Sequence, residues 1–153
     1  MAGSGVARRL AAAVAVVAPA ALALWSRAAW GAELPETVGT HWSSPGPADR
    51  TTPTHDLFAG AFGVSAIAAL LGATAGLLPR LHPLTRRLIL LATGSVSAIA
   101  ATQWMVPTWL TMRAGDPGEA VLGAWILIMF GAFAYGVLPL LLAPPPRQAH
   151  TSP

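Results

Sequence analysis

Four long apolar segments dominate the chain, and short polar segments separate them. The uninterrupted apolar runs cover residues 10–26, 57–79, 88–112 and 120–146, and none contains a charged side chain. An α-helix rises about 1.5 Å per residue and the hydrocarbon core of a bilayer is about 30 Å thick, so roughly 20 apolar residues cross it. The pattern predicts an all-α integral membrane protein, a four-transmembrane-helix bundle, with spans at about 10–32, 57–79, 88–112 and 120–143.

The first apolar segment admits two interpretations. The run ends before Arg27, and it reaches spanning length only if it continues to residue 32 with the Arg27 side chain extended to the interface. The alternative is a cleaved secretory signal, because Arg8 and Arg9 precede an Ala- and Val-rich core and small residues follow it. Trp30 in the cleavage region of such a signal, and the length of the apolar core, favour an uncleaved helix.

The distribution of charge predicts the orientation of the helices. Short cytoplasmic loops collect Lys and Arg, whereas translocated loops do not. With the N-terminus inside, six of the nine basic residues fall in the inner loop 80–87 and the two terminal segments, and three fall at the outer side. All six acids then belong to the outer loops 33–56 and 113–119: Glu33, Glu36, Asp49, Asp56, Asp116 and Glu119. We expect a multi-pass protein with cytoplasmic N- and C-termini, and a Pro-rich disordered tail over 144–153.

Composition agrees with a lipid environment and excludes several classes of function. Hydrophobic residues make up 54% of the chain and charged residues 10%, whereas soluble domains carry about 25% charged residues. The length indicates one membrane domain over 1–153. The basic residues are all arginine and form no stripe, so nucleic acid is not an expected partner. There is no cysteine, HExxH, phosphate loop or nucleophile elbow, and we expect no enzymatic activity and no cofactor.

Small residues at helical spacing indicate where helices approach one another. Gly72 and Gly76 form a GxxxG pair in the second span, and such pairs allow close backbone contact in lipid. The third and fourth spans contain similar pairs, Gly94/Ala98 and Ala132/Gly136. Packing within the bundle is the main interpretation of Gly72 and Gly76. A homo-oligomer seam, or contact with another membrane protein, is the alternative.

The loop at 33–56 is the one extended segment outside the predicted spans, and it carries the candidate chemistry. Loops of this length are commonly functional or disordered. Three interpretations of His41 and Trp42 stay open. In the first, His41 bonds a turn carbonyl or a headgroup and Trp42 anchors the loop at the interface. In the second, His41 and His55 bind zinc together with carboxylates drawn from Asp49, Asp56, Glu33 or Glu36, although the spacing matches no compact ligand pattern. The third is ligand recognition.

The tryptophans support ligand recognition on the outer side. All six fall in the outer half of the predicted topology: Trp25, Trp30, Trp42, Trp104, Trp109 and Trp125. A membrane anchor alone predicts Trp at both surfaces, although a one-sided belt remains the alternative. We hypothesise an aromatic outer cleft, covered by the loop, that accepts an amphipathic peptide, a lipid or a toxin. Its candidate ligand-binding residues are His41, Trp42, Asp49, Gln103, Trp104 and Trp109.

Residues 34–49 read LPETVGTHWSSPGPAD and follow directly on the first predicted span. Leu34-Pro35, Val38, Thr40-His41-Trp42, Gly46 and Asp49 resemble the pattern of the bacterial membrane family called domain of unknown function 1648. The resemblance implies a short multi-helix protein of the bacterial cell membrane, in a family with no established biochemical activity. A related group, the immunity proteins against a sporulation-delaying toxin, carries this domain in a longer chain and acts as a membrane receptor.

Together these observations favour a non-enzymatic module that acts through its outer face as a receptor, an immunity-like protein or a ligand sensor. An ion- or proton-coupled transporter usually keeps an ionisable group within the membrane, and the four apolar runs contain none. The alternative function is that of an accessory or assembly subunit of a membrane complex or transporter.

Overall fold

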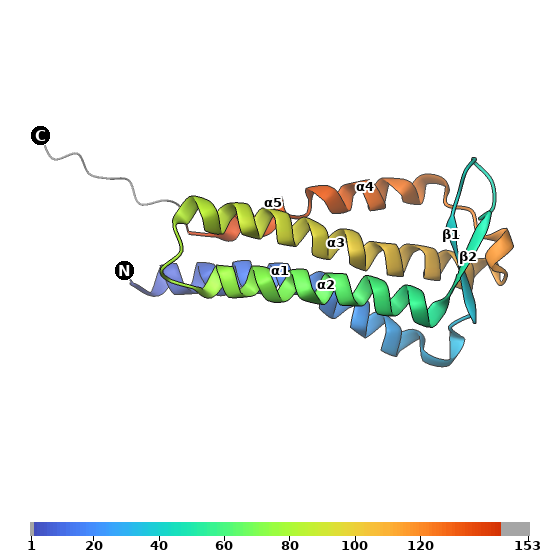
Figure 1. Cartoon of the computed structure of the whole chain (residues 1–153), viewed down its shortest axis with the longest axis horizontal. Coiled ribbons are helices and arrows are strands. Elements are labelled where there is room, and N and C mark those ends of the chain that lie inside the picture. The colour runs from blue at the N-terminus through green and yellow to red at the C-terminus, as the bar shows by residue number, and fades with distance from the viewer. Residues whose placement is uncertain (1, 145–153) are drawn as a thin grey trace, which may run out of the picture.

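The computed structural model of the chain describes residues 2–144. Figure 1 shows long helices lying side by side, with a two-stranded sheet across one end of them. The helices are α1 at Ala2–Trp30, α2 at Thr54–Leu77, α3 at Pro83–Ala114, and α4 at Ile126–Ala134 continued by α5 at Val137–Leu142. These helices form four segments long and apolar enough to cross a membrane, which confirms the predicted number of apolar helical segments. Residues 145–153, nearly all of the tail expected to be disordered, lie outside the described residues.

Two helices begin well before their predicted spans. Helix α1 begins at Ala2 rather than near residue 10, and α3 begins at Pro83 rather than at residue 88. Arginine is a good helix former, and proline is favoured in the first turn of a helix, so the Arg-rich segments and Pro83 are compatible with helix. The apolar runs therefore coincide with helical segments, and they underestimate the lengths of α1 and α3.

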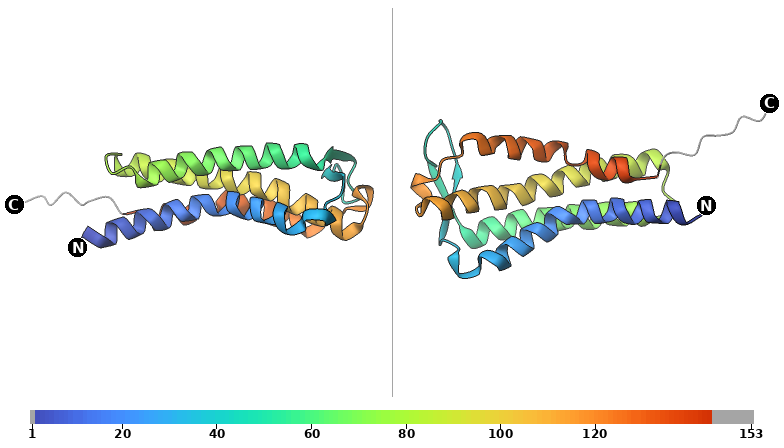
Figure 2. Two further views of the ribbon diagram at one scale, coloured as in Figure 1. Left: turned by 90° about the horizontal axis from the view of Figure 1, so that it is seen from below. Right: turned by 180° about the vertical axis from the view of Figure 1, so that it is seen from behind.

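Helix α3 occupies the centre of the bundle. It contacts α1, α2, α4 and α5, while α1 also contacts α2 and α5. The two views in Figure 2 show the helices running along the long axis of the molecule. Polar side chains join some of these helices, since the Ser65 hydroxyl on α2 donates to the Ser97 carbonyl on α3 at 3.0 Å. The interior is otherwise built mainly from alanine, so the helices approach closely.

The glycine pair of α2 packs inside the bundle. A Cβ added to Gly72 would lie 2.5 Å from Val16 Cγ1 of α1, and it would also collide with Thr93 of α3. A Cβ on Gly76 would lie 3.5 Å from Leu90 Cδ2. Both glycines are buried between α1 and α3 of the same chain. The face that carries Gly72 and Gly76 is therefore occupied, and it does not offer the homo-oligomer seam considered from the sequence.

The fourth predicted span, 120–143, is not one continuous helix. It contains a 3-10 turn at Gly123–Trp125, then α4, and it breaks at Tyr135 and Gly136 before α5. Pro139 lacks the N–H that would donate to the Tyr135 carbonyl in a regular helix, so the ladder is interrupted there. At this break the chain packs closely against α3, because a Cβ added to Gly94 would lie 3.1 Å from Gly136 Cα. The Tyr135 hydroxyl donates to the Ala15 carbonyl of α1 at 2.8 Å, which holds the break against the bundle.

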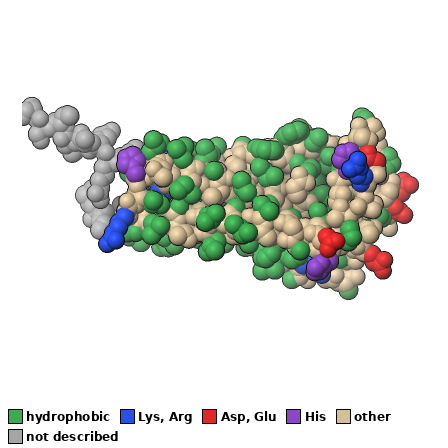
Figure 3. Space-filling model, viewed as in Figure 1, with side chains coloured by type: hydrophobic (Ala, Val, Ile, Leu, Met, Phe, Trp, Pro, Cys, Tyr) green, Lys and Arg blue, Asp and Glu red, His purple; other side chains and the backbone are tan. Residues whose placement is uncertain are grey.

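The two ends of the bundle differ in charge. One end, here called the arginine end, holds the start of α1, the α2–α3 turn and the end of α5, with Arg8, Arg9, Arg80, Arg86 and Arg87. The opposite end, called the hairpin end, comprises residues 31–53 and 115–125. The six acids of the chain belong to the hairpin end or to the first turn of α2. Figure 3 shows this separation, with red side chains gathered at the end opposite the chain termini.

Candidate functional site

The segment predicted as an extended loop forms a β-hairpin instead. Strand β1 at Thr37–His41 pairs antiparallel with β2 at Arg50–Pro53, with a bulge between Gly39 and His41. The register places Val38 opposite Thr52. Threonine and valine favour strands because their branched side chains suit a pleated surface, and this short run was the available signal for the hairpin. The expected all-α fold thus contains a small two-stranded sheet.

His41 and Asp49 close the tip of this hairpin. The His41 Nδ1 and Asp49 Oδ1 atoms lie 2.5 Å apart, and the Ser43 N–H donates to Asp49 Oδ2 at 3.1 Å. The Asp49 N–H also donates to the His41 carbonyl at 2.9 Å. Hydrogen bonds from Ser43 and His41 lower the pKa of Asp49 to about 2, because they stabilise the carboxylate. Both residues therefore serve the conformation of the tip.

The hairpin is fastened to the bundle by its first strand. The Gly39 N–H donates to the Thr111 hydroxyl of α3 at 3.1 Å, and Val38 is completely buried. A Cβ on Gly39 would lie 2.8 Å from the Pro117 carbonyl oxygen, so only glycine permits this approach. Where β2 leads into α2, the Thr54 hydroxyl donates to the Pro35 carbonyl, which lies just before β1. The hairpin is thus a docked cap on the helices.

Trp42 and Trp109 belong to one aromatic cluster beside this cap. The Trp42 indole N–H donates to the Ala120 carbonyl at 2.8 Å. The rings of Trp109 and Trp125 lie 4.5 Å apart, and the Arg113 guanidinium lies 5.2 Å from the Trp109 ring. Trp42, Trp109 and the completely buried Ala120 share one hydrophobic cluster. These contacts join the hairpin to the end of α3 and to the segment before α4.

Trp104 belongs to a second cluster and does not line an open cleft. Its side chain is completely buried, and its indole N–H donates to the Ser26 hydroxyl of α1 at 2.9 Å. The Trp104 ring lies 4.9 Å from Phe58 and 6.0 Å from Trp30. The hypothesised cleft placed Trp104 beside Trp109, but the two side chains point into different clusters. The single aromatic cleft is therefore a wrong prediction.

Gln103, another of the six candidates, faces an open groove. This groove has a volume of about 510 Å³ and lies between α2 and α3 at the hairpin end; it is called the α2–α3 groove. Its lining includes Asp56, Leu57, Gly60, Val96, Ile99 and Gln103. Gln103 is exposed there, and a Cβ added to Gly60 would meet no atom within 4 Å. Sequence reasoning did not bring Asp56 and Gly60 together with Gln103, because spacing along the chain does not show that α2 faces Gln103.

The histidines do not form the metal site that was considered as an alternative. Among residues 2–144, no group of three or more His, Cys, Asp or Glu side chains is arranged to hold a metal ion. His41 pairs with Asp49, while His55 Nδ1 lies 3.5 Å from Asp56 Oδ1 on the adjacent residue. Each imidazole therefore has a local carboxylate neighbour rather than a shared centre.

Comparisons with protein-family models, with curated proteins and with solved structures found no match to this chain. The resemblance of residues 34–49 to domain of unknown function 1648 stays a prediction.

Proposed function

We propose that this chain is a non-enzymatic protein of the bacterial cell membrane that crosses the bilayer four times and recognises a ligand in the α2–α3 groove. Its four apolar helices support insertion, and its charge separation supports an orientation with the arginine end in the cytoplasm. The groove then opens to the lipid just below the outer surface. This assignment matches a receptor or immunity-like module, as the resemblance of the hairpin segment implies.

The observation that carries this proposal is a polar pair at one end of an apolar groove. Gln103 offers an amide, and Asp56 offers a carboxylate, beside a lining formed mainly by Leu57, Val96 and Ile99. An amide within a membrane-spanning helix is costly in lipid unless it finds a hydrogen-bond partner. An amphipathic peptide with a basic end fits this arrangement, because its apolar face packs in the groove and its basic group pairs with Asp56.

The absence of a side chain at Gly60 leaves room for the backbone of a ligand to approach α2 in the same groove. Buried glycines such as Gly72 and Gly94 have neighbours that would collide with a side chain, so packing inside this chain accounts for them. Gly60 has open space instead, although glycine lowers helix stability by about 1 kcal/mol relative to alanine. Close approach of a ligand helix to α2 gives Gly60 a role comparable to that of Gly72.

An accessory subunit is the second candidate, and the exposed apolar face of α2 favours it. Val64 and Ile67 continue the surface beside Gly60 along α2, and both are exposed. A transmembrane helix of a partner protein would pack along the whole of this face of α2. A short peptide would occupy only the part nearest the hairpin end. The two candidates therefore share the groove and differ in the size of the occupant.

Photo-crosslinking in native membranes tests the groove directly. The chain contains no cysteine, so Gln103→Cys carries a single photo-crosslinker. We expect a crosslinked product from Gln103→Cys and none from the control Leu127→Cys, whose side chain is exposed on α4. The mass of the product distinguishes a peptide from a subunit.

A blocking substitution provides the matched control. Adding Gly60→Trp to Gln103→Cys fills the groove, and we expect it to abolish the crosslink. Gly131→Trp places the same side chain on α4, where a Cβ also meets no atom within 4 Å, and we expect it to leave the crosslink intact. Equal loss with both substitutions, or equal products from Gln103→Cys and Leu127→Cys, would contradict a specific site.

A further inference from the structure

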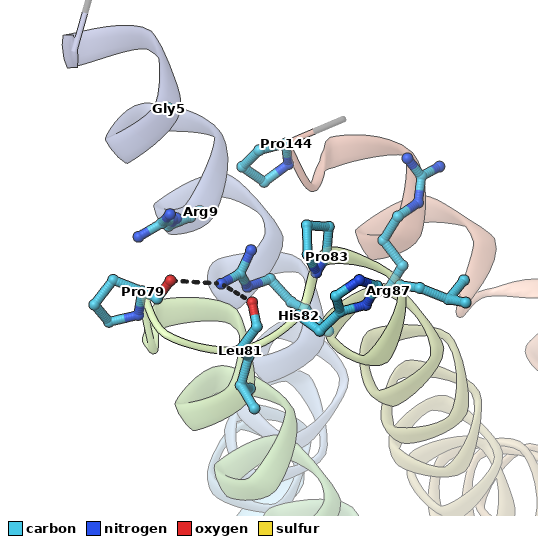
Figure 4. A pocket seen from close by; sticks show the side chains of 10 residues that line it. Gly5, Arg9, Pro79, Leu81, His82, Pro83, Arg87 and Pro144 are labelled. Atoms are coloured by element: carbon cyan, nitrogen blue, oxygen red, sulfur yellow. Dashed lines mark hydrogen bonds between the residues drawn. The ribbon is translucent and has the colours of Figure 1, made fainter. Parts of the chain in front are cut away.

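A second cavity lies at the arginine end, far from the groove. It has a volume of about 800 Å³, and its lining includes Gly5, Arg9, Leu81, His82, Arg87 and Pro144. Figure 4 shows side chains from the start of α1, from the α2–α3 turn and from the start of α3 gathered around it. The lining contains arginine and histidine and no acidic residue. The cavity therefore combines four segments of the chain in one basic environment, because Pro144, which follows α5, also lines it.

Two arginines at this end already have structural partners. Arg86, 4% exposed, donates to four carbonyls of the α2 end and the following turn at 2.6–3.5 Å: those of Ala75, Leu78, Pro79 and Leu81. Dashed lines in Figure 4 mark two of these bonds. Arg8 donates to the Leu141 and Ala143 carbonyls at the end of α5. Cations near the last turn of a helix satisfy its free carbonyls and oppose its dipole.

Arg9 differs from Arg8 and Arg86. Its Nε atom is buried and has no hydrogen-bond partner among the described residues. A buried donor on a charged group is costly when unpaired, so an acceptor is expected beside it. Every acid of the chain lies between residues 33 and 119, at the hairpin end or in the first turn of α2. The arginine end therefore offers Arg9 no acidic side chain as an acceptor.

The start of α3 adds a second attraction for an anion. Pro83 occupies the first turn of α3 and lines the cavity, so the positive end of the helix dipole lies there. The first turn of α3 contains no acidic residue, and its N-cap His82 makes no side-chain capping bond. Backbone N–H groups at such a terminus bind phosphate and carboxylate readily. Arg87, on the same turn of helix as Arg86, adds another guanidinium to the cavity wall.

We propose that this cavity binds a phosphate group, with Arg9 as its principal ligand and Arg87 and the start of α3 as further contacts. The planar guanidinium donates two parallel hydrogen bonds to phosphate oxygens, which suits Arg9 to this role. The phosphate belongs either to an anionic phospholipid headgroup or to a soluble phosphate ester. Arg9 immediately precedes the apolar run that begins at Leu10, which corresponds to headgroup depth in the proposed topology.

Lipid retention measured by native mass spectrometry tests this site. The full chain is placed in nanodiscs of phosphatidylcholine with a minor fraction of phosphatidylglycerol and is then released for measurement. We expect the wild-type protein to retain phosphatidylglycerol selectively, and Arg9→Gln to lower this retention about tenfold, as for loss of one charge-assisted hydrogen bond. Arg80→Gln removes the same charge at the same end without touching the cavity lining, and we expect little change.

Further arms distinguish the source of the phosphate. If inorganic phosphate binds the wild-type protein in lipid-free detergent and displaces phosphatidylglycerol, the site accepts a soluble phosphate ester. Retention of the lipid without competition by inorganic phosphate assigns the site to a headgroup. Failure of the wild-type protein to bind either probe would overturn the proposal, as would equal losses in Arg9→Gln and Arg80→Gln. Arg87→Gln provides a second variant if Arg9→Gln lowers helix content.

The phosphate site stands independently of the proposed ligand groove. Gly60→Trp fills the α2–α3 groove at the opposite end, and we expect it to leave retention of phosphatidylglycerol unchanged. A parallel loss in Gly60→Trp would show a general effect on the fold and would contradict a local site. Failure of the groove experiment alone leaves the expected lipid selectivity as it is.

Discussion

The two ends of the bundle solve the same problem by different means. Each end has to connect helices and satisfy the backbone groups left free where helices stop. At the hairpin end, strand pairing and uncharged side chains provide these bonds: the Thr111 hydroxyl accepts from the Gly39 N–H, and the Trp42 indole donates to the Ala120 carbonyl. At the arginine end, the guanidinium groups of Arg8 and Arg86 provide them. The hairpin end is fastened to the bundle mainly by uncharged hydrogen bonds and aromatic packing, and the arginine end by cations.

The way in which each end is held together determines which of its side chains are available to bind a ligand. At the hairpin end, His41, Trp42 and Asp49 build the cap, and Trp104 fills the core. At the arginine end, the sequence assigned the basic residues only to membrane orientation, yet Arg9 has a buried nitrogen that finds no partner within residues 2–144. The residues that the sequence singled out as ligand-binding candidates at the hairpin end thus mainly stabilise the fold. Basic residues of the arginine end, which the sequence linked only to membrane orientation, line a cavity.

The largest expected effect is the loss of the aromatic core near the hairpin end. Trp104→Ala removes a completely buried ring and its hydrogen bond to Ser26. We expect the free energy of unfolding to fall by about 3–5 kcal/mol, from lost packing and the cavity left behind. Reversible unfolding in mixed detergent micelles measures this change. Trp25→Ala is the matched control, because Trp25 is 66% exposed, and its effect should stay within about 0.5 kcal/mol.

The next effect concerns the cations of the arginine end. Arg86→Leu keeps an apolar stem but leaves the carbonyls around the α2–α3 turn without their donor. We expect a loss of about 1.5–3 kcal/mol in the free energy of unfolding, the range for hydrogen bonds to a charged group. The same unfolding assay compares it with Arg80→Leu, whose side chain is exposed. Equal effects of the two substitutions would show that Arg86 acts through net charge alone.

The smallest effect is a pH dependence confined to the hairpin. The pKa of Asp49 is lowered from 3.8 to about 2 in the folded protein, so the folded state favours the carboxylate. This contribution is present above the unfolded pKa and is lost as the pH falls from about 4 through 2. The protection of the Ser43 amide against hydrogen exchange, relative to an unstructured chain at the same pH, should fall over that window. No acidic side chain belongs to the arginine end, so exchange near Arg86 should not follow this titration.

Asp49→Asn is the control for this titration. The variant should exchange rapidly at Ser43 at every pH and should show no step between pH 4 and 2, because it has no carboxyl group to protonate. An unchanged step in Asp49→Asn would assign the titration to another acid of the hairpin end.

Much of the fold was predictable because lipid imposes a strong local rule. A run of about 20 apolar residues without charge has few structures other than a spanning helix. The hairpin escaped prediction because its strands are short and its signal, Val38 among threonines, is weak. The break at Gly136 escaped as well, since Pro139 lies in an apolar run where neighbouring helices tolerate it.

The candidate site was predictable in its residue types but not in its arrangement. Gln103 and Trp104 are adjacent in sequence, yet one side chain is exposed in the groove and the other is completely buried. Their positions on α3 differ by about 100° of helix rotation, and only the neighbours of α3 decide which position faces inward. The same holds for Gly60 and Gly72 on α2, of which the first is open and the second is enclosed.

The sequence by itself determined the number of apolar helices and the separation of acids from most arginines. Both depend on the hydrophobicity and charge of each segment taken alone, which set whether that segment prefers lipid or water. Only the tertiary structure decided which side of each helix is buried. Helices α2 and α3 carry apolar residues on nearly every side, so their sequences contain no single hydrophobic face to orient them. Contacts between small residues, such as Gly72 with Val16 and Gly94 with Gly136, set those faces instead.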